Sequence, residues 1–224
     1  MGLGLSSQVC GLARSLTSDV DACIDCGVDM VHVFIPTSDV QREYTIRKTR
    51  EQVLDTVNEI ITYARDHVDQ CMFSPMDATR TDWDYLIQVC RTAMDAGATI
   101  INVPDTVGVI TPGAMKRLIG RIGSEVNCPL DVHCHNDFGL AVANTLAAVE
   151  AGGTPVPVEG KRLGERAGKA DLGQTLFLLK ISQPPELRRI TLSFFLFQKK
   201  NYFFRGTNVI FFFFLLFHVF YYDF

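Results

Sequence analysis

The stretch DVHCHNDFGLAVAN, residues 131–144, passes from an apolar run through an acidic turn into a helical pattern. Two histidines, His133 and His135, stand one residue apart where the apolar run ends. Side chains alternate along a strand, so both imidazoles should point the same way and Cys134 the other way. The stretch therefore predicts a βα unit whose strand ends in a pair of imidazoles on one face.

Short apolar runs and helical patterns alternate in the same way over residues 8–158. Repeated βα units predict a parallel sheet, either an open doubly wound sheet or a (β/α) barrel. One helical pattern, TPGAMKRLIGRIG, begins with a Thr cap and a Pro at the first helical position. The other two helical patterns lie at 49–67 and 82–97; the apolar runs lie at 30–35, 70–73, 99–103 and 129–134, with weaker ones at 7–13 and 154–158.

Polar residues follow several of the apolar runs and favour the barrel. A TIM barrel carries its chemistry at the C-terminal ends of successive strands, whereas an open sheet binds its ligand at one switch point. No Gly-rich phosphate loop follows any of the runs. The polar ends read VFIPTSD, MFSPMDATRTD, NVPDTVG and DVHCHND.

Charge and cysteine usage exclude some classes of protein. The net charge of −4 gives no reason to expect a nucleic-acid partner. The seven cysteines are scattered and the first residues do not resemble a secretory leader, so we expect reduced thiols and a cytoplasmic protein. The pair CIDC, Cys23 to Cys26, is either a redox or metal pair or part of an amphipathic helix that ends at Gly27; we favour the helix.

Composition changes sharply near the C-terminus. Twelve of the 16 Phe residues lie within 194–224. Residues 1–180 are predicted to form the barrel domain, and residues 181–224 a Phe-rich tail of doubtful origin that is not a folded domain. The tail resembles translated non-coding sequence more than an anchor or a docking patch. Its apolar run, 209–222, is shorter than the roughly 20 residues of a spanning helix, so we expect no membrane contact.

The histidine spacing by itself leaves two interpretations open. Both imidazoles can reach one divalent ion, or they can be a polar pair at a strand end without metal. A metal site commonly adds a carboxylate and open positions for substrate. Asp131 shares the face of His133 and His135 but should lie two residues deeper in the barrel.

Five blocks of sequence together resemble one enzyme family. They are VCGLARS, VHVFIPTSD, PDTVG, HCHNDFGLAVANTLAAVEAG and GERAG, and they span about residues 7–180. They resemble the 2-isopropylmalate synthase, homocitrate synthase and citramalate synthase family of TIM-barrel metalloenzymes. NVPDTVG and FSPMDATRTD are most similar to 2-isopropylmalate synthase.

The resemblance implies a Claisen-type condensation of acetyl-CoA, the co-substrate, with a 2-oxo acid such as 2-oxoisovalerate, in leucine biosynthesis. A divalent cation (Mg²⁺, Mn²⁺ or Zn²⁺) would polarise the keto group. It implies His133 and His135 as metal ligands, and Thr106, His32 and Ser74 as substrate-binding residues; no catalytic acid or base is assigned. The plainer alternatives are a helix cap for Thr106 and a packed interior histidine for His32. A homo-oligomer stays open.

The chain also departs from the family pattern. The family's first strand ends in an Arg-Asp pair that supplies a metal ligand, and no such pair precedes Ser7. Met76 stands in place of an acidic residue, and Lys169 in place of an Asn beside the metal. Pro155 and Pro157 remove donors from the run at 154–158.

These departures predict an incomplete (β/α)8 TIM barrel, covering about strands two to seven, that binds metal weakly and is inactive as this chain. The alternatives are a non-catalytic fragment or a subunit that needs another chain, and less favourably a lyase or aldolase of the same superfamily.

Overall fold

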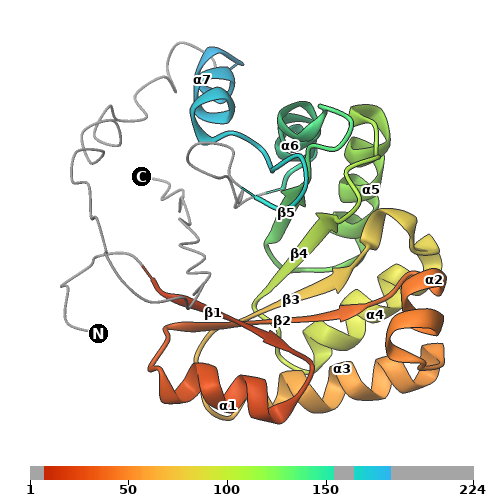
Figure 1. The fold of residues 1–224 in the computed structure, drawn as a ribbon, viewed down its shortest axis with the longest axis vertical. Helices are drawn as coiled ribbons and strands as arrows, with labels where there is room; N and C mark the ends of the chain where they lie inside the picture. Colours follow the sequence, from red (N-terminus) through yellow and green to blue (C-terminus); the bar gives the residue numbers. More distant parts are fainter. Residues whose placement is uncertain (1–7, 154–163, 183–224) are drawn as a thin grey trace.

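The computed structural model describes residues 8–153 and 164–182 (Figure 1). Within them, five strands form one parallel sheet in which each strand pairs with the next along the chain, in the order β1-β2-β3-β4-β5. A doubly wound sheet reverses its strand order at a switch point, and this sheet does not. The order is that of successive barrel strands. The strands are β1 (Cys10–Arg14), β2 (Met30–Pro36), β3 (Cys71–Met76), β4 (Ile100–Asp105) and β5 (Leu130–Cys134).

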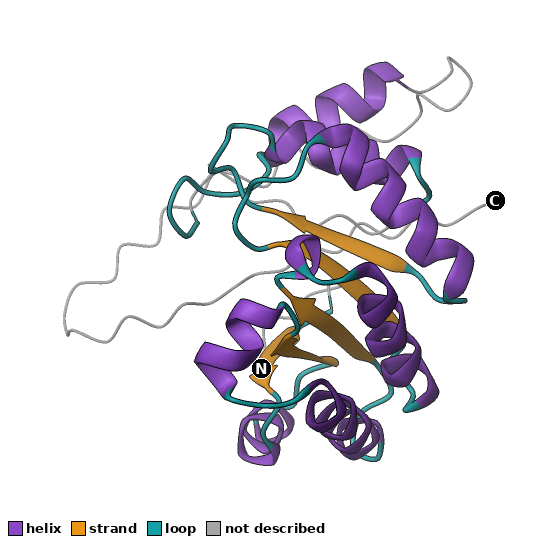
Figure 2. Cartoon of the chain, turned by 90° about the vertical axis from the view of Figure 1, so that its right-hand side faces the viewer, coloured by secondary structure: helices purple, strands orange, loops and turns teal. Residues whose placement is uncertain are grey.

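The longer helices between the strands lie along one face of the curved sheet (Figures 1 and 2). The other face is the inner face of the barrel, and within the described residues the sheet does not close. The helices are α1 (Thr17–Asp25), α2 (Asp39–Gln41), the π-helical η1 (Arg42–Ile46), α3 (Arg50–Arg65), the 3₁₀ turn η2 (Ala78–Arg80), α4 (Trp83–Asp95), α5 (Pro112–Glu125), α6 (Ala141–Glu150) and α7 (Leu172–Ser182).

Local sequence explains where the principal helices begin. Helix α3 starts with a capping box, in which the Thr49 side chain accepts from the Gln52 N–H and the Gln52 side chain accepts from the Thr49 N–H. The Asp82 carboxylate accepts from the Tyr85 N–H and caps α4. Helix α5 begins with Pro112 at its first position, as predicted, but the side chain of Thr111 before it makes no capping hydrogen bond.

The two faces of each strand have different roles. In β2, Val31, Val33 and Ile35 are buried against the helices in the main apolar core. Alternate residues point to the inner face, where Met30 of β2 joins Met72 and Ile100 in a smaller apolar layer. The polar side chains on this inner face therefore lie next to a layer of apolar side chains, and they define the candidate site.

Most of the predicted elements are present, with shifted bounds. The weak run at 7–13 is strand β1, and the CIDC pair lies in and just after α1, with Gly27 at φ 64° beyond the helix end. The prediction of a strand at 154–158 falls outside the described residues, as does nearly all of the tail at 181–224. In the part of the chain that the structure describes, no helix is long and apolar enough to cross a bilayer.

Candidate metal and substrate site

The two histidines converge at the C-terminal end of β5. His133 Nε2 and His135 Nε2 lie 3.2 Å apart, with the ring centroids 4.9 Å apart and the rings tilted by 62°. His135 is 4% exposed, and Cys134 between them is buried in the core on the other face. The strand period therefore brings the imidazoles to one point of the inner face.

This separation fits two ligands of one divalent ion. Two nitrogens at ~2.0–2.1 Å from a tetrahedral metal lie roughly 3.3 Å from each other. Among the described residues, however, no group of three His, Cys, Asp or Glu side chains is placed to hold an ion. One carboxylate, that of Glu165, lies with its Oε2 4.0 Å from His135 Nε2, and its side chain is 68% exposed. Among the described residues, the geometry therefore suits two ligands of a metal ion, without a third side chain beside them.

The electrostatics of the pair act in two directions. Burial, followed by the positive charge of Lys169, lowers the pKa of His133 well below its ordinary value. Burial, followed by Arg166 and Lys169, lowers the pKa of His135 to about 4. Both imidazoles are therefore neutral at pH 7, the form that binds metals. The same two cations repel a divalent ion at this point.

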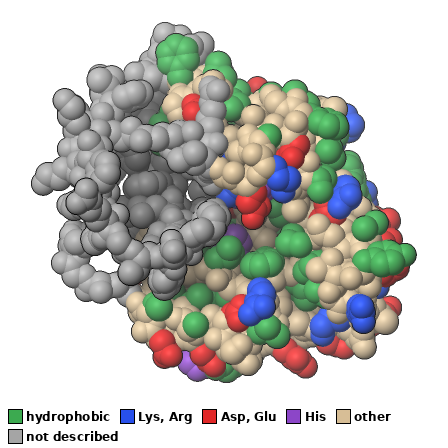
Figure 3. Space-filling view, viewed as in Figure 1, with side chains coloured by type: hydrophobic (Ala, Val, Ile, Leu, Met, Phe, Trp, Pro, Cys, Tyr) green, Lys and Arg blue, Asp and Glu red, His purple; other side chains and the backbone are tan. Residues whose placement is uncertain are grey.

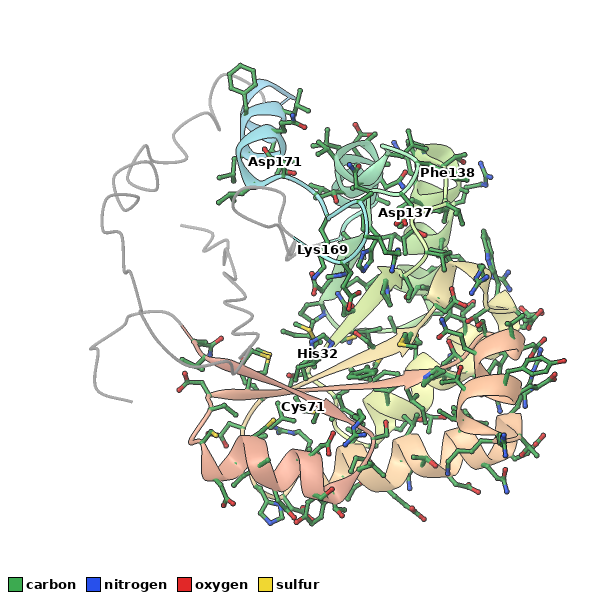
Figure 4. All side chains as sticks on the ribbon, in the orientation of Figure 1. His32, Cys71, Asp137, Phe138, Lys169 and Asp171 are labelled. Atoms are coloured by element: carbon green, nitrogen blue, oxygen red, sulfur yellow. The ribbon has the colours of Figure 1, made fainter. Side chains whose placement is uncertain are left out.

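The backbone of Lys169 pairs with that of His135, and its positive charge acts on both imidazoles. His135 and Lys169 face each other in an isolated antiparallel bridge, and Lys169 is only 7% exposed. Figure 4 shows Lys169 next to the upper end of β5, close to the loop that carries Asp137. Lys169 therefore lies next to the histidine pair.

Arg166 connects the segment that carries Lys169 to the loops that follow β4 and β5. Arg166 makes a bidentate ion pair with Asp137, at 2.7 and 2.9 Å, and its Nη2 also donates to the Thr106 carbonyl at 2.6 Å. Arg166 adopts a φ of 55°, in the left-handed region that ordinary side chains rarely occupy. Sequence reasoning did not single out Arg166 or Asp137, although both lie inside motifs that it used, GERAG and HCHND.

Thr106 is placed at the end of β4 with its hydroxyl partly engaged. Its Oγ1 accepts from the Asp77 N–H at 2.8 Å, and helix α5 is preceded by Thr111 instead, so Thr106 is not a helix cap. An accepting hydroxyl keeps its own proton for another partner. Thr106 can therefore still donate to a ligand at the barrel mouth.

The strand register places His32 level with Met72 and Ile100, deeper in the sheet than the histidine pair at the C-terminal end of β5. Figure 4 shows His32 below Lys169. His32 Nε2 lies 2.6 Å from Ser74 Oγ, and Ser74 Oγ donates to Asn102 Oδ1 at 2.7 Å. Asn102 Nδ2 in turn donates to Asp131 Oδ2 at 2.6 Å. Burial raises the pKa of Asp131 well above its ordinary value. The sequence analysis did not name Asn102 as a site residue. The signal for it was an amide side chain inside the otherwise apolar run TIINV.

The surface around the site carries charges of both signs without a large block of either (Figure 3). A histidine side chain is visible in a recess in the middle of this view. Such mixed charge agrees with a small-molecule site and gives no reason to expect nucleic-acid binding.

Fold and site together are those of a TIM-type barrel sheet with a histidine pair at the end of one strand. The family model described as HMGL-like matches residues 3–192, and the chain belongs to this family.

Several relatives and solved structures are similar to it. It is 58% identical over 176 residues to "Probable 2-isopropylmalate synthase" of Methanosarcina mazei, covering 79% of this chain and 34% of that protein. It is 51% identical to 2-isopropylmalate synthase of Methanocaldococcus jannaschii, covering 79% and 34%, and 45% identical to homocitrate synthase AksA of Methanopyrus kandleri, covering 79% and 45%. The HMG-CoA lyase of Bacillus subtilis superposes with a TM-score of 0.67 at 16% identity, covering 77% of this chain and 62% of that one, which shows the fold alone. The chain thus spans about a third of the length of the first two relatives.

Proposed function

We propose that this chain carries the oxo-acid-binding part of an acyltransferase that condenses acetyl-CoA with 2-oxoisovalerate to give 2-isopropylmalate in leucine biosynthesis. The observation that supports it best is the convergence of His133 and His135 at the end of β5, in a chain 58% identical to a protein named for that activity. Thr106 stands at the end of the neighbouring strand. The proposal places the chain in the cytoplasm, since its seven cysteine thiols are unpaired.

Each candidate residue has a definite part in this proposal. His133 and His135 would hold the divalent cation through their neutral Nε2 atoms, and the cation, when bound, would polarise the keto group of the acid. Thr106 would donate its hydroxyl proton to the acid. His32 and Ser74 would line the deeper part of the pocket, beneath the histidine pair. Acetyl-CoA would be the second substrate.

We propose further that the chain does not complete a turnover by itself. Lys169 places a cation beside the imidazoles, and Met76, at the end of β3, offers a thioether that can neither take nor hold a proton. Among the described residues, no third His, Cys, Asp or Glu side chain is grouped with the histidine pair to hold an ion. These observations favour the second candidate function, a non-catalytic chain or a subunit that works with another chain. A lyase of the same family has only the fold likeness in its favour.

Metal and oxo acid binding test the proposal together. Calorimetry with Zn²⁺ or Mn²⁺ should give no site tighter than about 10 µM, because the ligand set is incomplete. Adding 2-oxoisovalerate should tighten metal binding, whereas isovalerate, which lacks the keto oxygen, should not. Equal effects of the two acids would contradict the proposed substrate class. Tight one-to-one metal binding lost in His135→Ala would show that another residue completes the site.

The contribution of Lys169 is measured in the same titrations. Lys169→Met removes the charge while keeping an apolar chain of similar length, and should raise metal affinity by roughly tenfold or more. Lys116→Met removes a lysine of α5 that pairs with Glu150 on the surface, and is the matched control. Unchanged affinity in Lys169→Met would mean that its ammonium does not oppose the metal.

A further inference from the structure

Four polar side chains from four neighbouring strands form one continuous hydrogen-bonded chain across the inner face. It runs from His32 on β2 through Ser74 on β3 and Asn102 on β4 to Asp131 on β5, with separations of 2.6, 2.7 and 2.6 Å. Ser74, Asn102 and Asp131 are 4%, 2% and 0% exposed. At this depth an unsatisfied polar group is costly, so the pattern of donors and acceptors along the chain is tightly constrained.

The direction of the chain follows from the amide of Asn102. Its Nδ2 donates to Asp131 Oδ2, so its Oδ1 faces Ser74. A hydroxyl has a single proton, and Ser74 donates it to Asn102. Ser74 Oγ can therefore meet His32 only as an acceptor, which requires the proton of His32 to sit on Nε2. The direction does not depend on the charge of Asp131, because Oδ2 accepts equally when a proton resides on Oδ1.

We propose that Ser74, Asn102 and Asp131 are positioning residues that hold His32 as its Nε2–H tautomer, which makes Nδ1 the accepting nitrogen of the ring. The choice of tautomer is thus made three strands away, at a carboxyl group that does not touch His32. The proposal rests on the proposed function only in assigning His32 to the ligand pocket.

Imidazole nitrogen spectra of the whole ¹⁵N-labelled chain test this without metal or substrate. The His32 resonances are assigned by their loss in His32→Gln. We expect Nε2 to be protonated and Nδ1 unprotonated near pH 7.5, with the Nε2 proton protected from water. Ser74→Ala should speed exchange of that proton by about tenfold, through loss of its hydrogen-bond acceptor.

The decisive variant is Asn102→Ala, which does not alter a group in contact with His32. It removes the acceptor of the Ser74 proton, so the Ser74 hydroxyl is free to turn and the His32 Nε2–H resonance should shift and exchange faster. Asn144→Ala is the matched control. Asn144 is another buried amide, but its Nδ2 donates to the Ile110 carbonyl and takes no part in the hydrogen bonds that lead to His32.

Two results would overturn the proposal. A His32 ring protonated on Nδ1 in the unaltered chain would mean that the hydrogen bonds run in the opposite direction; this result needs no variant, so it decides the matter even if Asn102→Ala does not fold. A His32 resonance that responds equally to Asn102→Ala and Asn144→Ala would mean that Asn102 does not position His32. Neither result bears on metal or oxo acid binding, so failure here is separate from failure of the proposed function.

Discussion

At the scale of single residues, two kinds of contact build the site: strand alternation groups the two histidines, and long-range hydrogen bonds join the loops around them. Period-two alternation was enough to put His133 and His135 together and Cys134 behind them. The bonds of Arg166 to Asp137 and Thr106 depend on loops that are 29 and 60 residues apart in the chain. No local pattern encodes such contacts, because they arise only when the strand ends meet.

The lowered pKa of His135 makes stability depend on pH. The pKa of His135 is about 6.5 in the unfolded chain, its ordinary value, whereas burial lowers it to about 4 in the folded chain. Between these values the unfolded state binds more protons, so the free energy of unfolding falls as the pH falls through this window. The shift corresponds to an upper bound of about 3 kcal/mol.

Urea unfolding between pH 7.5 and 4.5, in the presence of EDTA, measures this effect. His135→Gln should flatten the loss of stability relative to the unaltered chain, and the comparison cancels the contributions of other groups that titrate in the window. His67→Gln controls for removing an imidazole from an exposed position. If His135→Gln and the unaltered chain lose stability in parallel, burial does not keep His135 neutral.

At the scale of elements, the sequence predicted the longer helices well because residues near their starts favour helix initiation. The capping box at Thr49 and the proline at Pro112 mark helix starts within a few residues of sequence. The short π-helical segment η1 and the turn η2 were not predicted, since neither has a long hydrophobic period. The loops after β4 and β5 depend on close approach between backbones, which a single glycine permits.

A substitution at Gly108 tests whether the loops after β4 and β5 approach each other closely. Gly108 has a φ of 67°, and a Cβ there would overlap the Asp137 carboxylate and come within 2.8 Å of the Asp137 backbone nitrogen. Gly108→Ala should therefore lower the free energy of unfolding by at least about 1 kcal/mol. Gly120, inside α5, has open space around its Cβ position, so Gly120→Ala should raise it by about 0.5–1 kcal/mol.

Urea denaturation of both alanine variants gives the comparison directly. Opposite signs of the two changes are expected, although both replace glycine by the same residue. A neutral Gly108→Ala would show that the loops after β4 and β5 do not pack against each other as described.

At the scale of the whole molecule, the barrel was predictable because its strands follow one another in sequence and each ends in polar residues. The strand order confirms successive barrel strands and excludes the doubly wound alternative. The chain matches about a third of the length of its first relatives. Among its described residues, no group of three His, Cys, Asp or Glu side chains is placed to hold a metal ion. The central proposal, which rests on Lys169 beside the histidine pair and on Met76 at the end of β3, is a barrel with an oxo acid site that does not condense substrates by itself.

Thiol release from acetyl-CoA in the presence of 2-oxoisovalerate tests this claim most directly. With Mg²⁺, Mn²⁺ or Zn²⁺ added in turn, the purified chain should release no thiol above the level seen without the oxo acid. Turnover above about 0.1 per second, within the range of working enzymes, that disappears in His133→Ala would contradict it. Such a result would mean that the histidine pair, despite Lys169 beside it, belongs to a complete active site.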